Sequence, residues 1–397
     1  MTRPGHLRGM VVLTGLQFVI SVADWMLIVL LQIVVFDLTR SAFDIMLLVI
    51  CELISMLLFG AWAGAIADRT SLKRVLIWAC VARLLIIMGL LWPSVRGQLG
   101  AIFAIAVLGA ICSRFIAPAA SAVLPSLVTA DRLPAANAII MAARMSGMAA
   151  GTLFAGLVAS HYGHMAAIAM IGALLFMASV LCILLPNTRS RPEPVDRAGI
   201  WHDLYLAISR YGSNLMLPVL VSMLVMLALG SFEIIALIYV VQVLERPPAD
   251  VGLLFGAYGV GMLVGLALSA WQGINRRYGM VMIICLCLMC VAIWGLSQVH
   301  TLGLALPLVT VAGSSEGLVI TLSLLCLYQQ VSGDFYARMI ALLDTATGGA
   351  FLLSVMLTGM VADRIAAGTL IEGLAITLSG LLVAGIVASN LRLGERH

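Results

Sequence analysis

The stretch NTRSRPEPVDRAGIWHDLYLAISRYGSN, residues 187–214, is the only long polar segment in this chain of 397 residues. Six apolar runs lie on each side of it, and most approach the about 20 residues that a membrane-spanning helix needs. The runs are Val11–Phe36, Ile45–Ala65, Val75–Trp92, Leu99–Val123, Ala135–Ser160, Met165–Leu185, Leu215–Val243, Val251–Trp271, Val281–Leu296, Leu302–Leu327, Met339–Val361 and Leu370–Leu391. The sequence therefore predicts an all-α membrane protein with twelve transmembrane helices. They form two pseudo-symmetric six-helix bundles, residues 1–186 and 215–397, joined by a cytoplasmic central loop at 187–214.

The overall composition excludes several classes of protein. The chain is 63% hydrophobic and only 10% charged, whereas soluble domains are about 45–50% apolar and about 25% charged. Disordered and nucleic-acid-binding proteins do not fit this balance. The eight cysteines all lie in apolar runs; even CLCLMC (Cys285–Cys290) has no histidine or carboxylate nearby, so we interpret these thiols as small buried side chains. We expect no metal, no cofactor and no enzymatic activity.

The distribution of lysine and arginine predicts the orientation in the membrane. With the N-terminus inside, fifteen of these residues fall in cytoplasmic segments and four fall on the opposite face: Arg40, Arg96, Arg246 and Arg364. Cytoplasmic loops of membrane proteins carry the excess of positive charge. We expect a multi-pass protein of the plasma (inner) membrane, with both termini and the central loop in the cytoplasm.

The segment GAIADRTSLKR, Gly64–Arg74, connects the second and third runs. Its Gly-x-x-x-Asp-Arg core with a following basic pair resembles the loop signature of the major facilitator superfamily, although Ser71 replaces the second glycine of that signature. The resemblance implies two six-helix halves that rock around a midplane cavity. It also implies a conformational latch on the cytoplasmic side, formed by Gly64, Asp68, Arg69, Lys73 and Arg74.

The fifth run carries GMAAGTLFAG, Gly147–Gly156. It resembles the Gly-x-x-x-Gly-Pro-x-x-Gly-Gly signature of antiporters in the same superfamily, but Thr152 replaces the proline. Gly147, Gly151 and Gly156 thus have two interpretations. They form an antiporter motif, or they only allow the close helix packing that small residues give membrane proteins.

Three further stretches, VADWML, LTRSAFDIMLL and LPSLVTADRLPAANA, resemble the exporter branch that contains macrolide efflux pumps and enterobactin-type siderophore exporters. This resemblance implies alternating-access export driven by the proton gradient. It does not identify the cargo.

Eight charged side chains fall inside the apolar runs and away from their ends: Asp24, Glu52, Arg83, Arg114, Arg144, Glu233, Glu316 and Asp344. A charge at the bilayer centre costs about 2.5–3.5 kcal/mol on insertion scales, and such residues usually face a cavity or a partner. The family resemblance puts all of them except Arg83 on helices that border the cavity. We interpret Arg83 as structural, pairing toward Glu52, and we expect Arg114 to be the partner of Asp24.

Protonation during transport is expected at Asp24, Glu52, Glu316 and Asp344. Substrate contacts are expected at Asp24, Arg114, Arg144, Glu233 and Glu316. A carboxylate held between burial and a nearby arginine can load and release a proton as access alternates. The alternative is a fixed ion pair that only locks helix packing.

The function predicted from these patterns is proton-coupled export of an amphiphilic small molecule such as a siderophore or drug. Because arginine cannot be neutralised, Arg114 and Arg144 favour a zwitterionic or anionic cargo. The alternative is a transporter of lysophospholipid or another lipid on the same fold. We expect the partners to be the small-molecule substrate, protons and the lipid bilayer, without nucleic acid, and the protein to be a monomer.

Overall fold

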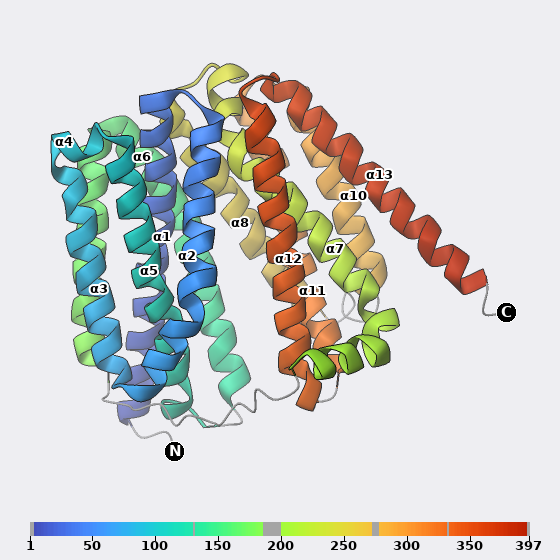
Figure 1. Cartoon of the computed structure of the whole chain (residues 1–397), viewed down its shortest axis with the longest axis horizontal. Helices are drawn as coiled ribbons and strands as arrows, with labels where there is room; N and C mark the ends of the chain where they lie inside the picture. The colour runs from blue at the N-terminus through green and yellow to red at the C-terminus, as the bar shows by residue number, and fades with distance from the viewer. Residues whose placement is uncertain (1–3, 130–131, 186–199, 272–277, 332, 395–397) are drawn as a thin grey trace. The chain divides into compact units, whose positions relative to one another are not determined.

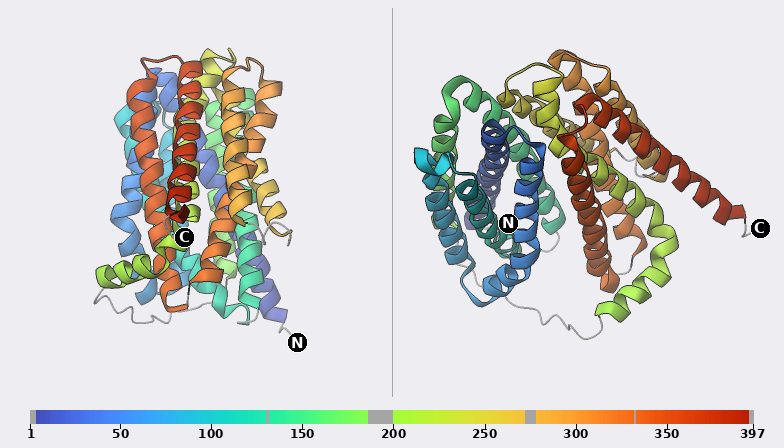
Figure 2. Two further views of the ribbon diagram at one scale, coloured as in Figure 1. Left: turned by 90° about the vertical axis from the view of Figure 1, so that its right-hand side faces the viewer. Right: turned by 45° about the horizontal axis from the view of Figure 1, so that its top comes forward.

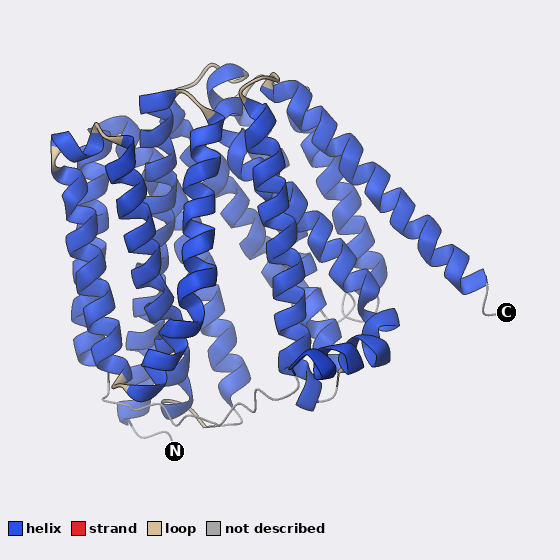
Figure 3. Ribbon diagram, in the orientation of Figure 1, coloured by secondary structure: helices blue, strands red, loops and turns tan. Residues whose placement is uncertain are grey.

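The computed structural model describes residues 4–129, 132–185, 200–271, 278–331 and 333–394. Within these ranges the chain is helical and contains no strand (Figure 3). The helices are α1 (Pro4–Thr39), α2 (Ala42–Arg69), α3 (Leu72–Met88), α4 (Pro93–Arg96), α5 (Leu99–Val123), α6 (Leu133–Leu184), α7 (Ile200–Gln242), α8 (Val251–Ser269), α10 (Tyr278–Ser297), α11 (Leu302–Gln330), α12 (Gly333–Ala362) and α13 (Ala367–Gly394), with short 3₁₀ turns η1 (Gly89–Leu91), η2 (Leu124–Ser126) and η4 (Pro248–Asp250).

Each of the twelve predicted runs lies within helix, except for at most two residues at an end, and several of the helices extend well beyond their runs. In the part of the chain that the structure describes, nine helices are long and apolar enough to cross a membrane. One of them, the segment Ala135–Leu184 of α6, covers two predicted runs. Its direction changes at Gly163, whose φ of 80° lies in the region that glycine adopts without strain.

The central segment differs from the predicted loop. Residues 186–199 lie outside the described residues, but α7 begins at Ile200, so the second half of the segment is helical. No proline interrupts residues 200–214, and the apolar residues Trp201, Leu204 and Ile208 recur at intervals of three and four. This spacing is typical of an amphipathic helix.

The chain divides into two compact units. The first comprises residues 1–194 together with 247–259, and the second comprises residues 195–246 and 260–397. The boundary therefore falls within α8, after Gly259, rather than only in the central segment. In the first unit, α1, α2, α3, α5 and α6 run side by side (Figures 1 and 2). The bounds of the two bundles stay a prediction.

In the first unit, α1 and α6 approach each other closely at two glycines. A Cβ added at Gly147 would lie 2.7 Å from the Phe18 carbonyl oxygen, and one at Gly151 would lie 2.5 Å from the Val22 carbonyl oxygen. Beside them, Ser21 Oγ donates a hydrogen bond of 2.7 Å to the Arg144 carbonyl. Since helices in lipid associate through van der Waals packing and hydrogen bonds, these contacts hold α1 against α6.

The second unit repeats this contact between α7 and α12. Ser354 Oγ donates a hydrogen bond of 2.5 Å to the Leu227 carbonyl, and a Cβ at Gly230 would lie 2.6 Å from the Phe351 carbonyl oxygen. In both units a serine of one helix donates a hydrogen bond to a backbone carbonyl of the other helix, and that carbonyl lies three residues before a glycine. The glycine in turn lies against the backbone carbonyl three residues before the serine. The two units therefore share a local packing motif.

Candidate functional site

Asp24 of α1 and Arg83 of α3 form an ion pair inside the first unit. Asp24 lies near the middle of the apolar segment Arg8–Thr39, and Arg83 lies near the middle of Leu72–Leu91. Arg83 Nη1 donates to Asp24 Oδ1. The Arg83 side chain is only 4% exposed, whereas that of Asp24 is 29% exposed. The pair therefore lies at mid-membrane depth, with its cation enclosed and its carboxylate partly accessible.

This pairing corrects two predictions. The prediction that Arg114 pairs with Asp24 was wrong, because Asp24 pairs with Arg83. The prediction that Arg83 pairs toward Glu52 was wrong for the same reason. The position of a residue within an apolar run gives its depth but not the direction in which its side chain points. The long Arg83 side chain reaches Asp24 from α3, a helix that the family resemblance placed outside the cavity.

Glu52 and Arg114 complete the cluster. The Arg114 guanidinium of α5 is close enough to the Glu52 carboxylate of α2 for a favourable Coulombic interaction. Arg114 and Arg83 are also close enough to repel each other. Two carboxylates and two guanidinium groups from α1, α2, α3 and α5 thus gather in one place. Charges of opposite sign stabilise each other strongly where water is scarce, so we call these four residues the charge cluster.

The two arginines of the charge cluster retain unused hydrogen-bond donors. The Nε atoms of Arg83 and Arg114 are buried and have no hydrogen-bond partner among the residues that the structure describes. A buried N–H without an acceptor is costly. Each of these N–H groups therefore still has the capacity to donate one charge-assisted hydrogen bond.

The glycine contacts described above hold the part of α1 that carries Asp24. Asp24 follows Ser21 by one turn of α1, next to the backbone that Gly147 and Gly151 contact. A Cβ at Gly252 of α8 would lie 2.6 Å from the backbone nitrogen of Gly156. All three glycines of the antiporter-like motif thus lie at helix contacts, which favours the packing interpretation, while their role in antiport stays a prediction.

The second unit contains the other carboxylates. Glu316 of α11 is 2% exposed and Glu233 of α7 is 9% exposed. The two helices run in opposite directions and are joined by a hydrogen bond of 2.8 Å between Ser222 Oγ and Ser323 Oγ. Glu233 follows Ser222 by about three turns, and Glu316 precedes Ser323 by about two. The two glutamates therefore lie within about one turn of the same depth. Asp344 of α12 is exposed.

The remaining predicted residues lie elsewhere. The Arg144 side chain is exposed on α6. Gly64, Asp68 and Arg69 fall in the last turns of α2, but their side chains lie outside what the structure describes. Lys73 Nζ donates a hydrogen bond of 2.5 Å to the Ile183 carbonyl, which ties the first turn of α3 to the last turn of α6. Arg74 is exposed.

Sequence reasoning missed the hydroxyl groups of the second unit. Ser231 Oγ lies 2.7 Å from Ser354 Oγ and 2.9 Å from Thr358 Oγ1. Near the C-terminal end of α7, the Tyr239 hydroxyl donates a hydrogen bond of 2.8 Å to the Val299 carbonyl. Single serines and threonines are common in membrane helices and predict no site. Ser354 and Thr358 are one turn apart and therefore lie on the same face of α12, which is the one sequence signal for this group of hydroxyls.

Helices that repeat in two units, with charges paired at mid-membrane depth in the first unit, are typical of a membrane transporter, and the family match below indicates a transporter and not an enzyme. The sequence matches the Major Facilitator Superfamily over residues 13–355, and the chain belongs to this family. A search of curated proteins found no matching sequence.

Three solved structures show the same fold. A mutant form of the nucleoside transporter NupG has a TM-score of 0.78 and 13% identity, covering 95% of this chain and 99% of its own. A POT family transporter in complex with a thioalcohol-conjugated peptide has a TM-score of 0.71 and 14% identity, covering 96% of both chains. An inward-facing bacterial homologue of the human lysosomal transporter Spinster has a TM-score of 0.70 and 13% identity, covering 98% of this chain and 96% of its own.

Proposed function

We propose that this chain is a proton-coupled exporter of a zwitterionic or anionic amphiphile, working by alternating access. Transport of a small molecule across a membrane follows from the family. Export and proton coupling rest on the sequence resemblance to efflux pumps and on the charge cluster. The observation that carries the proposal is the Asp24–Arg83 ion pair, because it places a titratable carboxylate beside a permanent cation at mid-membrane depth.

The charge cluster can exchange a proton for cargo. In a zwitterionic cargo, the cationic group competes with a proton for the carboxylates of Asp24 and Glu52, so each proton that binds displaces that group. An anionic group of the cargo accepts hydrogen bonds from the unused Nε–H donors of Arg83 and Arg114. Because the proton and the cargo compete for the same carboxylates, the transporter carries one across the membrane in one direction and the other in the opposite direction. This exchange is antiport.

Residues of the second unit extend this scheme. Glu316 and Asp344 serve as further protonation sites, and Glu233 and Glu316 contact the cargo. Arg144 adds a positive charge toward an anionic group of the cargo. The segment from Gly64 to Arg74 acts as a latch that holds one conformation, with both termini in the cytoplasm and the protein working as a monomer in the inner membrane.

The test is transport into inside-out vesicles under an imposed proton gradient. The cargo panel contains a macrolide, a cationic dye, a carboxylate siderophore and a lysophospholipid. We expect one cargo to move in the wild type, to stop when the gradient collapses and to be lost in Asp24→Asn. Asp44→Asn, at the first turn of α2, is the matched control and should transport normally.

Unchanged transport by Asp24→Asn would exclude Asp24 as a coupling residue. Movement of the lysophospholipid alone would instead support the alternative function, a lipid transporter.

A further inference from the structure

A groove of about 350 Å³ lies between α7, α12 and α13 in the second unit. Along α13 it runs from Thr369 to Leu381, which is about 18 Å at 1.5 Å per residue. The hydrocarbon core of a bilayer is about 30 Å thick, so the groove has about the length of one leaflet. Its polar and glycine lining residues are Ser231, Ser354, Thr358, Thr369, Gly373 and Thr377.

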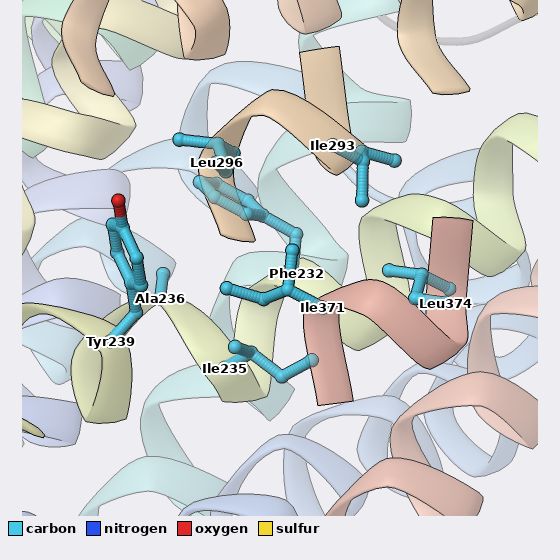
Figure 4. Close-up of a pocket in the computed structure, with 8 residues that line it drawn as sticks. All are labelled: Phe232, Ile235, Ala236, Tyr239, Ile293, Leu296, Ile371 and Leu374. Atoms are coloured by element: carbon cyan, nitrogen blue, oxygen red, sulfur yellow. The ribbon is translucent and has the colours of Figure 1, made fainter. Parts of the chain in front are cut away.

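The groove exists because α12 and α13 diverge. They leave a common turn and separate along their length in two views (Figures 1 and 2). The first turns of α13 pack instead on α7 and α10, where Ile371 and Leu374 face Phe232, Ile235 and Ile293 (Figure 4). The face of α13 toward α12 is therefore left without a protein partner over the length of the groove.

The membrane around the groove indicates which molecule fills it. Its walls belong to membrane-spanning segments of α7 and α12 and to the apolar helix α13. A void forfeits the dispersion contacts of every atom that lines it, and the mobile material beside these helices is lipid. A long, narrow, mainly apolar groove that begins at a membrane surface matches an acyl chain in shape.

The hydroxyl groups of the groove are arranged along its depth. Deep in the groove, Ser231 Oγ, Ser354 Oγ and Thr358 Oγ1 bind one another, and Ser354 donates onward to the Leu227 carbonyl. They satisfy each other and need no water. Thr369 lies two residues after the start of α13, at the mouth of the groove. Its hydroxyl can donate to a lipid ester oxygen, which lies at the same depth as the ends of the helices.

We propose that this groove binds one acyl chain of a glycerophospholipid from the leaflet in which α12 ends and α13 begins. The lipid completes the packing of α13 and is not transported. This site is separate from the charge cluster, and its existence does not depend on the proposed function.

The experiment uses a phosphatidylethanolamine with a photoreactive diazirine on one acyl chain, in nanodiscs that contain the full chain. Gly373→Leu is the test variant, because a Cβ at Gly373 meets nothing within 4 Å and a leucine would fill the groove. Gly380→Leu is the matched control: it is equally open, but it faces a different hollow, between α10 and α13.

We expect labelled peptides to concentrate on the groove-lining turns of α12 and α13. Labelling there should fall at least fivefold in Gly373→Leu and stay within twofold of wild type in Gly380→Leu. Even labelling around the protein, or unchanged labelling of Gly373→Leu, would show ordinary annular lipid and overturn the proposal. Displacement of the probe by a transported cargo would also overturn it, since the groove would then be a substrate site.

Thr369→Leu provides a second variant at the exposed mouth of the groove, in case Gly373→Leu does not fold. It should lower labelling at least twofold, and unchanged labelling would count against the proposal. Photolabelling requires no transport, so loss of the exporter function leaves this result readable.

Discussion

The two residues of the ion pair in the first unit are expected to differ in how much stability their replacement costs. Breaking a buried pair by removing one partner typically costs about 3–5 kcal/mol, because the other charge is left uncompensated. Asp24→Asn leaves Arg83, whose side chain is 4% exposed. Arg83→Leu leaves Asp24, whose side chain is 29% exposed. We therefore expect Asp24→Asn to be the more destabilising of the two.

The magnitude of the difference follows from the cost of neutralising the residue that remains. At pH 7, giving a proton to an ordinary aspartate costs about 4 kcal/mol, and removing one from an ordinary arginine costs about 8 kcal/mol. Protonation of Asp24 therefore limits the stability that Arg83→Leu can lose to about 4 kcal/mol. Deprotonation of Arg83 limits the stability that Asp24→Asn can lose only at about 8 kcal/mol. At pH 5 the cost for an aspartate falls to about 1.5 kcal/mol. The stability deficit of Arg83→Leu should therefore shrink as the pH falls, and that of Asp24→Asn should not.

The assay is denaturant unfolding in mixed micelles at pH 7 and pH 5, followed by tryptophan fluorescence. The double variant Asp24→Asn/Arg83→Leu leaves no unpaired charge, so its free energy of unfolding should return to within about 1 kcal/mol of wild type. The reasoning fails if Arg83→Leu is the less stable single variant at pH 7. It also fails if the double variant is as unstable as the sum of the two.

Three other predictions concern separate parts of the chain. Gly151→Leu should separate α1 from α6 and lower the free energy of unfolding by at least about 2 kcal/mol. The control Gly109→Leu should lower it by less than about 1 kcal/mol, because a Cβ at Gly109 meets nothing within 4 Å. Equal losses in the two variants would refute the contact. Tyr239→Phe removes the bond to the Val299 carbonyl and should lower the free energy of unfolding in the same assay by about 1 kcal/mol, and an unchanged value would show that this bond contributes nothing. Asp68→Asn should abolish vesicle transport while leaving the protein folded, and full transport by this variant would remove the latch.

The apolar runs predicted most of the architecture because a spanning helix needs a minimum length of apolar sequence whatever it packs against. Each run lies within helix apart from at most two residues at an end, as the first run, Val11–Phe36, lies inside α1. The sequence predicts two separate runs on either side of residues 161–164, whereas α6 continues through this gap and changes direction only at Gly163. The helical start of α7, from Ile200, was not predicted because this part of the segment is polar and therefore indicated a loop. The spacing of its apolar residues at three and four positions was the signal for a helix.

Three of the four members of the charge cluster were predicted as site residues, but Arg83 was interpreted as structural and the pairing was not predicted. Asp24, Glu52 and Arg114 were found because charges are rare inside apolar runs, and their depth follows from their position. The direction of each side chain depends on the rotation of its helix, and for Asp24 that rotation is held by the contacts of Ser21, Gly147 and Gly151 between α1 and α6. No pattern within a single run reports such a contact.

The central claim is that Asp24 exchanges protons for cargo, and the most direct measurement is proton movement driven by the cargo itself. Proteoliposomes are loaded with the cargo that moves in the vesicle assay, no pH gradient is imposed, and a pH-sensitive dye reports the lumen. Outward cargo movement should bring protons inward in the wild type, and Asp24→Asn should show no such proton entry. Cargo efflux without proton entry in the wild type, or equal proton entry in Asp24→Asn, would contradict the account.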